Sequence, residues 1–189
     1  MIKAIIFDFF GVVGESTYQL IADRHQLSSS QLDQLTDLHK SFDNGFISEI
    51  DFFRAYADII GISYQEFMED YYDSGERLET SHAVLAYAKE LRKNYKIGLL
   101  SNVGESSYNK FIQPIEHCFD AVVTSHQAQL AKPDVAIFEL TANKLGVDAC
   151  ECVMIDDSST NCQGAMAAGM QALLYKDINA LKLQLESLR

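Results

Sequence analysis

The chain has 189 residues, of which 48% are hydrophobic and 22% are charged. These proportions are typical of a soluble globular protein with one core domain and room for a small insert. The 27 acidic residues outnumber the 15 basic ones, and the formal net charge of -12 argues against binding to phosphate backbones or anionic lipid. We therefore expect a small-molecule partner, with no nucleic acid and no membrane among the partners.

The N-terminal segment has the features of neither a signal peptide nor a membrane helix. Its apolar run contains Asp8 and lacks a small-residue cleavage site, and no other stretch approaches the roughly 20 apolar residues that a membrane helix needs. The four cysteines form no CxxC pair, so a structural zinc site is not indicated. These features predict a cytoplasmic protein with reduced thiols.

Short apolar runs rich in β-branched residues alternate with segments of helical period along most of the chain. The predicted strands are Ile2–Phe7, Ile97–Leu100, Ala121–Thr124, Cys152–Ile155 and Ala172–Tyr175. The predicted helices beside them are Ser81–Lys93, residues 105–112, Asp134–Gly146, Thr160–Ala168 and Asn179–Leu188. This alternation is typical of an α/β fold in which helices cover both faces of a parallel sheet.

One interval after the first predicted strand contains helical patterns and no convincing strand. The patterns cover Gln31–Phe42, Glu49–Ile60 and Tyr64–Tyr72. We predict a helical subdomain at residues 14–79, inserted into an α/β core that consists of residues 1–13 and 80–189. Gly14 and Ser74-Gly75 are the expected flexible junctions, as in a lid that covers an active site.

Polar side chains follow four of the predicted strands. Ligands of a parallel sheet bind beyond the carboxyl ends of its strands, so we expect these side chains to meet at one edge. They are Asp8 after the first strand, Ser101 and Asn102 after the second, Lys132 in the loop after the third, and Asp156 with Asp157 after the fourth. Asp8 interrupts the apolar stretch IIFDFFGVV, where a buried carboxylate needs either a partner or a function.

Four segments carry these residues: FDFFGVV, LLSNVG, AKPDVAIFE and MIDDSSTNCQGAMAAGM. In order and spacing they resemble the four motifs of the haloacid dehalogenase superfamily of hydrolases, and the resemblance covers nearly the whole chain. The insert segment NGFISEIDFFRAYADIIGI resembles the cap of the branch that contains sugar-phosphate phosphatases and the N-terminal phosphatase domain of soluble epoxide hydrolases. The resemblance implies a Rossmann-like parallel core with a small, all-helical, mobile cap inserted after the first strand.

The resemblance also implies a chemistry, hydrolysis of small phosphorylated metabolites. Asp8 is the expected nucleophile, which forms an aspartyl-phosphate and divides one difficult displacement into two easier ones. Mg²⁺ is the expected cofactor, held by Asp8, the backbone carbonyl of Phe10, Asp156 and Asp157. Lys132 and Ser101 are the other expected catalytic groups. The expected substrate-binding residues are Phe10, Gly11, Ser101, Asn102 and Lys132.

The chain departs from the family pattern at Phe10. Most phosphatases of the family carry a second aspartate there, which protonates the leaving group and then activates water. A phenyl ring cannot transfer a proton, so this contribution, typically on the order of 10²–10⁴-fold in rate, is lost or replaced. Val12, where many members have threonine, removes a hydroxyl as well.

Three interpretations of this departure stay open. In the first, a phosphatase acts on a fairly good leaving group, or water or a residue such as Glu15 or His25 supplies the proton. In the second, a metal-free 2-haloacid dehalogenase releases halide, which needs no proton; family dehalogenases carry an aromatic residue at position 10, but their fourth motif is serine-rich where this chain has two aspartates.

In the third interpretation, a non-catalytic relative binds a phosphorylated ligand or a protein.

Four basic residues of the insert are candidates for contact with the substrate. We interpret them as surface helix charges: Arg24, His25, His39 and Arg54. The substrate and the oligomeric state are not indicated by the sequence.

Overall fold

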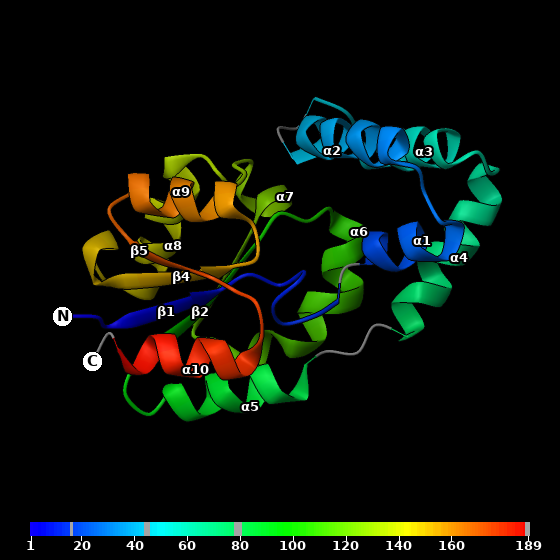
Figure 1. Cartoon of the computed structure of the whole chain (residues 1–189). Helices are drawn as coiled ribbons and strands as arrows, with labels where there is room; N and C mark the ends of the chain where they lie inside the picture. Colours follow the sequence, from blue (N-terminus) through cyan, green and yellow to red (C-terminus); the bar gives the residue numbers. More distant parts are fainter. Residues whose placement is uncertain (16, 44–45, 78–80, 188–189) are drawn as a thin grey trace. The chain divides into compact units, whose positions relative to one another are not determined.

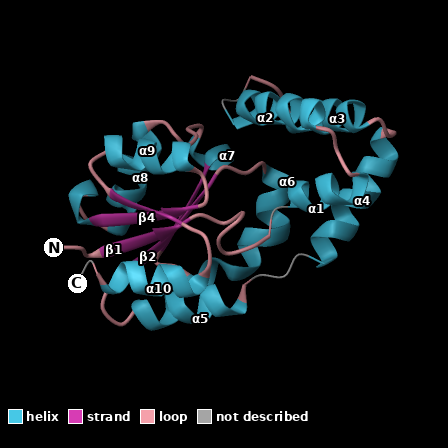
Figure 2. Ribbon diagram, in the orientation of Figure 1, coloured by secondary structure: helices cyan, strands magenta, loops and turns pink. Residues whose placement is uncertain are grey.

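The computed structural model describes residues 1–15, 17–43, 46–77 and 81–187 (Figures 1 and 2). The chain divides into two compact units, Met1–Gly14 with Thr80–Arg189 and Glu15–Glu79, which we call the core unit and the helical unit. Gly14 falls in the core unit rather than in the predicted insert, and its amide donates a hydrogen bond to the Phe9 carbonyl. No helix of the described residues is long and apolar enough to cross a membrane.

The core unit is built on a five-stranded parallel sheet, with the strand order β3-β2-β1-β4-β5. The strands are β1 (Ala4–Phe7), β2 (Lys96–Ser101), β3 (Ala121–Thr124), β4 (Cys152–Asp156) and β5 (Gln171–Leu174). The central strand, β1, is buried along its whole length, as expected of a strand covered on both faces. The predicted α/β class is therefore confirmed, although β1 begins at Ala4 and not at Ile2.

One face of the sheet is covered by α8 (Val135–Leu145) and α9 (Ser159–Ala167) (Figure 1). Ile6, Leu100 and Phe138 belong to the buried apolar cluster on this face. Gly98 of β2 lets α8 approach closely, because a Cβ atom there would lie 3.0 Å from a methyl group of Leu145. The helix begins after Asp134, whose side chain accepts a hydrogen bond from the Ala136 amide.

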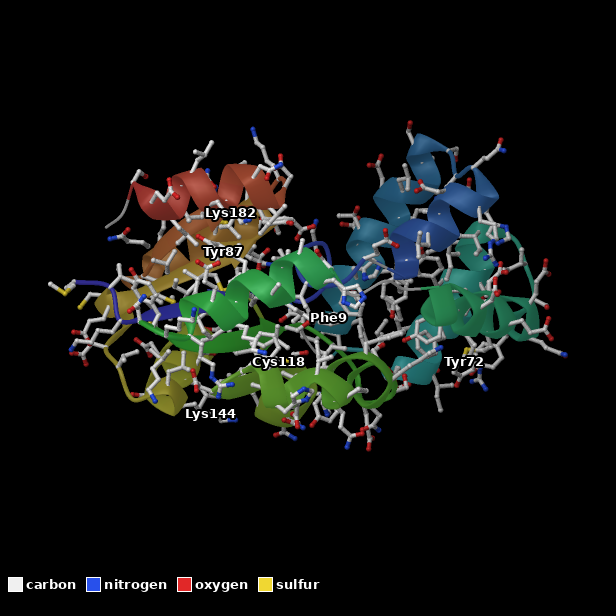
Figure 3. The ribbon with its side chains drawn as sticks, turned by 90° about the horizontal axis from the view of Figure 1, so that it is seen from below. Phe9, Tyr72, Tyr87, Cys118, Lys144 and Lys182 are labelled. Carbon is white, nitrogen blue, oxygen red and sulfur yellow. The ribbon has the colours of Figure 1, made fainter. Side chains whose placement is uncertain are left out.

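The opposite face is covered by α5 (His82–Leu91) and α10 (Ile178–Glu186) (Figures 1 and 2). The Lys182 ammonium lies 5.3 Å from the centroid of the Tyr87 ring, which connects the two helices by a cation–π contact; Figure 3 shows both residues. Ser81 caps α5 and Asp177 caps α10 through side-chain oxygens that accept backbone amides. Both helices of this layer are therefore capped at their N-termini.

The segment after β2 differs from the single helix predicted at residues 105–112. It begins as a short α-helix, α6 (Glu105–Ser107), continues as a π-helix, η1 (Tyr108–Ile112), and ends as a 3₁₀-helix, η2 (Gln113–Cys118). Pro114 lies in the first turn of η2 and has no amide to continue the preceding hydrogen-bond pattern. Two further short elements are α7 (Ser125–Ala128) and η3 (Ala149–Glu151).

The helical unit contains α1 (Thr17–His25), α2 (Ser29–Asp43), α3 (Glu49–Ile60) and α4 (Tyr64–Arg77). Helix α1 was not predicted, and α4 continues through Ser74 and Gly75, so the junction predicted there is wrong. Aromatic side chains dominate the core of this unit: Phe52, Phe53, Tyr56, Phe67 and Tyr71. Their rings touch one another in edge-to-face and tilted pairs, which pack a small helical unit around a shared apolar centre.

The four basic residues of the helical unit that were considered as substrate contacts do not share one environment. Arg24 forms an ion pair with Asp70, and His25 Nε2 lies 2.6 Å from Asp70 Oδ2, so both residues connect α1 to α4. His39 is half-buried against the rings of Tyr18 and Phe52, and burial lowers its pKa to about 4. The interpretation of His39 as a surface charge is therefore wrong, because the ring packs as part of the aromatic core.

The fourth of these residues, Arg54, is exposed. Its guanidinium lies 3.9 Å from Asp51 and 5.8 Å from the ring centroid of Tyr64. These contacts fit a charge on the surface of a helix, worth little to stability.

Candidate active site

The site begins with Asp8, at the carboxyl end of the central strand. The Asp8 amide donates a hydrogen bond to the Ile155 carbonyl at 2.9 Å, and Phe7 pairs with Ile155 in the parallel register of β1 and β4. This register places Asp8 beside Asp156, the last residue of β4. Asp8 is only 6% exposed, and its Oδ1 accepts a hydrogen bond from the Phe9 amide at 2.7 Å.

Lys132 joins the two carboxylates. Its Nζ lies 2.8 Å from Asp8 Oδ1 and 2.7 Å from Asp156 Oδ2, and its side chain is 1% exposed. Asn102 positions the loop that carries the lysine, because its Nδ2 donates to the Lys132 carbonyl at 2.9 Å and its Oδ1 accepts from the Lys132 amide at 2.8 Å. Asn102 therefore contacts the backbone of a neighbouring site residue at both ends of its amide.

Asp156 is held by more partners than the sequence indicated. Its Oδ1 accepts hydrogen bonds from the Ser158 amide at 2.9 Å and from Asn161 Nδ2 at 3.1 Å. Asn161 lies in the first turn of α9, which Ser158 caps. The only sequence signal for this role of Asn161 is its position in the helix that follows a strand ending in an acid.

Gly11 and Asp157 lie in close contact. Gly11 has a φ of +80°, and a Cβ atom added there would lie 2.1 Å from Asp157 Oδ2. A side chain at position 11 would therefore displace the Asp157 carboxylate as well as strain the backbone. The turn itself is tight, because the Phe9 carbonyl accepts hydrogen bonds from the amides of Val12, Val13 and Gly14.

Three carboxylates gather at this edge of the sheet. One oxygen from each of Asp8, Asp156 and Asp157 lies within 4.8 Å of the others. Burial raises the pKa of Asp8 to about 8, against the opposing effect of Lys132, and desolvation and the neighbouring Asp156 raise the pKa of Asp157. Burial also acts to lower the pKa of Lys132, but Asp8 and Asp156 outweigh it and hold that pKa above its ordinary value.

Within the described part of the chain a single ammonium group faces these three carboxyl groups, so their ionised forms are not fully balanced. Such a set of hard oxygen ligands fits a small divalent cation, because Mg²⁺ prefers carboxylate oxygens and a partly open coordination sphere. Asp157 is the exposed member of the three. The residues present therefore fit the predicted metal.

Phe10 is half-buried within an aromatic group. Its ring centroid lies 4.9 Å from that of Phe9 and 6.1 Å from that of Phe111 in the π-helix, both in edge-to-face geometry. An isolated bridge pairs Phe10 with Gly14 through the Phe9 carbonyl and the Gly11 amide, so it does not use the Phe10 carbonyl. The carbonyl proposed as a metal ligand is thus left out of the turn's own hydrogen bonds.

Ser101 ends β2, the strand beside β1. It is fully buried, and its Oγ has no hydrogen-bond partner within the described part of the chain. Thr124, its neighbour in the register of β2 and β3, is in the same state. Buried hydroxyls are usually bonded, so both are available to a ligand or solvent at this edge. Ser101 makes no contact with Asp8 that matches those of Lys132.

A family model described as haloacid dehalogenase-like hydrolase matches residues 2–169 of the chain. The chain belongs to the haloacid dehalogenase-like hydrolases. The predicted family and parallel fold are thus confirmed. In this family the chain resembles human N-acylneuraminate-9-phosphatase, 31% identical over 109 residues, which are 56% of this chain and 44% of that protein.

A second relative is glyceraldehyde 3-phosphate phosphatase of Methanothermobacter thermautotrophicus, 35% identical over 85 residues, or 43% of this chain and 38% of that protein. The chain thus spans less than half the length of these two relatives. Among solved haloacid dehalogenase-like structures, an enzyme from Bacteroides thetaiotaomicron in complex with magnesium and inorganic phosphate has a TM-score of 0.71 at 21% identity, and the match covers 96% of this chain and 99% of that one. This likeness supports the fold.

Proposed function

We propose that the protein is a Mg²⁺-dependent phosphatase of small phosphorylated metabolites. The observation that supports this proposal best is the buried contact of Lys132 with both Asp8 and Asp156, beside the open carboxylate of Asp157. A nucleophile, a buried cation and a cluster of carboxylate oxygens are the parts that phosphoryl transfer needs. The phosphatase names of the two relatives point to the same class of substrate.

The residues that would hold Mg²⁺ are Asp8, Asp156 and Asp157, with the backbone carbonyl of Phe10. When bound, the ion neutralises the phosphate charge and orients the phosphoryl group. Asn161 and Ser158 keep Asp156 in place, and Gly11 leaves room for Asp157. These supporting contacts fix the carboxylates before any ligand arrives.

Asp8 supplies the attacking carboxylate oxygen in this proposal. Lys132 keeps that carboxylate oriented through its 2.8 Å contact and places a positive charge where the phosphate binds. Ser101 contributes an unpaired hydroxyl to a phosphoryl oxygen, and Gly11 offers backbone where a side chain is excluded. The aromatic ring of Phe10 forms one side of the proposed substrate site. Asn102 does not contact the substrate in this proposal, but positions the loop that carries Lys132. The role of residues 14–79 as a cap stays a prediction.

A dehalogenase is the second candidate, and Phe10 is the observation that favours it. Halide leaves carbon without a proton, so an aromatic residue beside the nucleophile is no handicap in that reaction. The gathering of Asp8, Asp156 and Asp157 within 4.8 Å favours the phosphatase instead, because a reaction without metal has no use for three adjacent carboxylates.

Turnover of a panel of phosphate monoesters, measured with Mg²⁺ and again with EDTA, tests the proposal. We expect phosphate release that EDTA abolishes and added Mg²⁺ restores. Release of chloride from 2-chloropropionate, unaffected by EDTA, would establish the dehalogenase instead. Absence of both activities in a folded protein that binds phosphorylated ligands would show a non-catalytic binding protein.

A further inference from the structure

The turn that follows Asp8 carries no side chain able to transfer a proton. We call residues Phe9–Gly14 the Asp8 turn. Its side chains are two phenyl rings and two isopropyl groups, and the other two residues are glycines. Phe9, Val12 and Val13 are at most 3% exposed, so only Phe10 presents part of a side chain to its surroundings. The segment that directly follows the nucleophile in sequence therefore has only apolar side chains.

The Phe10 ring of the Asp8 turn makes aromatic contacts with two neighbouring rings. Phe9 and Phe111 both meet its ring edge-to-face, and Phe9 and Phe111 are themselves stacked with centroids 6.5 Å apart. Edge-to-face pairs of this kind are each worth about 0.5–1.5 kcal/mol, so the two contacts favour this position of the ring. The turn thus presents a phenyl surface where a proton donor would otherwise lie.

The polar groups next to Asp8 already have partners. The Lys132 ammonium donates to both Asp8 and Asp156, and the Asn102 amide is bound at both ends to the Lys132 backbone. Asn161 Nδ2 donates to both oxygens of Asp156. Of the described residues that contact Asp8 or its partners, none offers a free carboxyl or imidazole group to an oxygen that leaves phosphorus, because the proposed function assigns Asp157 to the metal. Lys132 keeps a third N–H, which the proposed function assigns to the bound phosphate.

From this we infer that the enzyme acts on phosphates whose leaving oxygen belongs to an acidic hydroxyl, namely acyl, phenolic or anomeric phosphates, in preference to phosphates of ordinary alcohols. The inference rests on the proposed phosphatase function. It concerns the class of leaving group and not the remainder of the substrate.

The chemistry of the first step explains the preference. An Asp8 oxygen forms a bond to phosphorus while the bond from phosphorus to the leaving oxygen breaks, and that oxygen departs with the electron pair as an anion. It takes its proton from solvent afterwards. A carboxylic acid (pKa about 4) and a phenol (pKa about 10) ionise far more easily than an ordinary alcohol, whose pKa lies near that of water. An anomeric hydroxyl lies between the phenol and the alcohol, because the ring oxygen withdraws electrons from it.

The second step does not need the same help. Water attacks phosphorus, the bond from phosphorus to the Asp8 oxygen breaks, and the carboxylate leaves as an anion while the water proton passes to solvent or phosphate. The leaving group here is a carboxylate, which is stable as an anion near neutral pH. Leaving-group dependence is therefore expected in kcat/KM, which reports the first step, and not in a kcat limited by the second.

The test measures kcat/KM of the unaltered protein for nitrophenyl, chlorophenyl and phenyl phosphates, and for glucose 1-phosphate against glucose 6-phosphate. In the first of these sugar phosphates the leaving oxygen is anomeric, and in the second it belongs to a primary alcohol. We expect kcat/KM to fall steeply with leaving-group pKa, towards the limit of about tenfold per pKa unit for full charge on the oxygen. Glucose 1-phosphate should exceed glucose 6-phosphate. Independence of kcat/KM from solvent viscosity verifies that bond cleavage is being measured.

Variants at the Phe10 position sharpen the test. Phe10→Asp should flatten the dependence and raise kcat/KM for the poorest leaving groups, by up to on the order of 10²-fold, because a carboxyl group can then donate the proton. Asparagine has nearly the same shape as aspartate but no acidic proton. The Phe10→Asn variant should therefore retain the steep dependence of kcat/KM on leaving-group pKa. The slope for the unaltered protein decides the matter even where these variants fold poorly.

Two outcomes would overturn the inference while the proposed function stands. One is Mg²⁺-dependent turnover with kcat/KM nearly independent of leaving-group pKa. The other is a preference for glucose 6-phosphate. Either would show that the leaving oxygen need not belong to an acidic hydroxyl. Absence of any Mg²⁺-dependent phosphate release would instead reject the proposed function itself.

Discussion

Two charged clusters hold elements of this protein together, and they are built in opposite ways. In the core unit, Lys132 lies between Asp8 and Asp156, all three nearly or fully buried. In the helical unit, Arg24 pairs with Asp70 and Asp73, and His25 pairs with Asp70. The arginine side chain of this second cluster is 33% exposed, and each carboxylate has a basic partner.

The difference lies in the balance of charge and solvent. Solvent screens the helical-unit cluster, so its pairs add little stability and serve to connect α1 with α4. The core cluster buries three charges and has Asp157 beside it, at a desolvation cost that stability alone does not explain. A buried, unbalanced cluster is therefore expected to be indispensable for function, and the exposed one to be replaceable. The following predictions run from the largest expected effect to the smallest.

Asp8→Asn should give the largest effect. It removes the attacking carboxylate, so phosphatase turnover should fall at least on the order of 10³-fold. Burial raises the pKa of Asp8, so ionisation of this side chain destabilises the folded state at any pH above its ordinary pKa. The Asp8→Asn variant should therefore have an unchanged or a higher free energy of unfolding. Steady-state kinetics and urea unfolding measure the two quantities.

The control for that variant is Asp58→Asn, at an exposed position of α3, which should alter neither quantity. Turnover that survives Asp8→Asn would exclude a covalent aspartyl intermediate.

Lys132→Met should be the most destabilising single change in the core cluster. It leaves Asp8 and Asp156 buried without their shared cation, which typically costs about 3–5 kcal/mol in the free energy of unfolding. Lys144→Met is the matched control on the exposed surface of α8, where Figure 3 labels the residue, and should change stability by less than about 0.5 kcal/mol. Equal effects from the two variants would mean that the buried contacts are not what holds these carboxylates.

His39 should make the helical unit sensitive to acid. Burial lowers its pKa to about 4 from an ordinary value of 6.5, so the unfolded chain binds a proton that the folded chain excludes. The associated stability is complete above about pH 6.5 and is lost as the pH falls towards 4, by about 2 kcal/mol at pH 5. Thermal unfolding from pH 7 to 5 measures it, and His39→Phe should remove this part of the dependence. A pH profile unchanged in the variant would contradict burial of a neutral ring.

Arg24→Gln should give the smallest effect. The guanidinium is partly exposed and solvent screens its pairs with Asp70 and Asp73, so we expect a loss of about 1 kcal/mol or less in the free energy of unfolding. Added salt should reduce that loss further. A cost as large as that of Lys132→Met would remove the contrast between the two clusters.

The core sheet was predictable because its strands are short apolar runs that end at polar residues. Ala121–Thr124 was predicted with its observed bounds, and the carboxyl-end rule brought Asp8, Lys132 and Asp156 to one edge. The side-chain contacts of Asn102 and Asn161 were not predictable, because they depend on loop conformations that periodicity does not encode. The geometry supports the predicted site, and the roles of its residues stay predictions.

The helical segments were harder to predict where the amphipathic pattern is weak. Helix α1 buries Ile21 and Ala22 among its described side chains and is otherwise largely polar, so its apolar face is too narrow to be recognised. Tyr108–Ile112 has a helical pattern in the sequence, but the pattern does not distinguish an α-helix from the observed π-helix.

The central claim is that the carboxylates of the core cluster form a Mg²⁺ site, and calorimetric titration with Mg²⁺ tests it most directly. Asp157→Asn is the matched variant, because Asp157 is the exposed member of the set and makes no contact with Lys132 comparable to those of Asp8 and Asp156. We expect saturable binding of one ion per chain, weakened at least tenfold in the variant, whose fold is retained. No saturable binding to the unaltered protein, or equal affinity in both proteins, would contradict the claim.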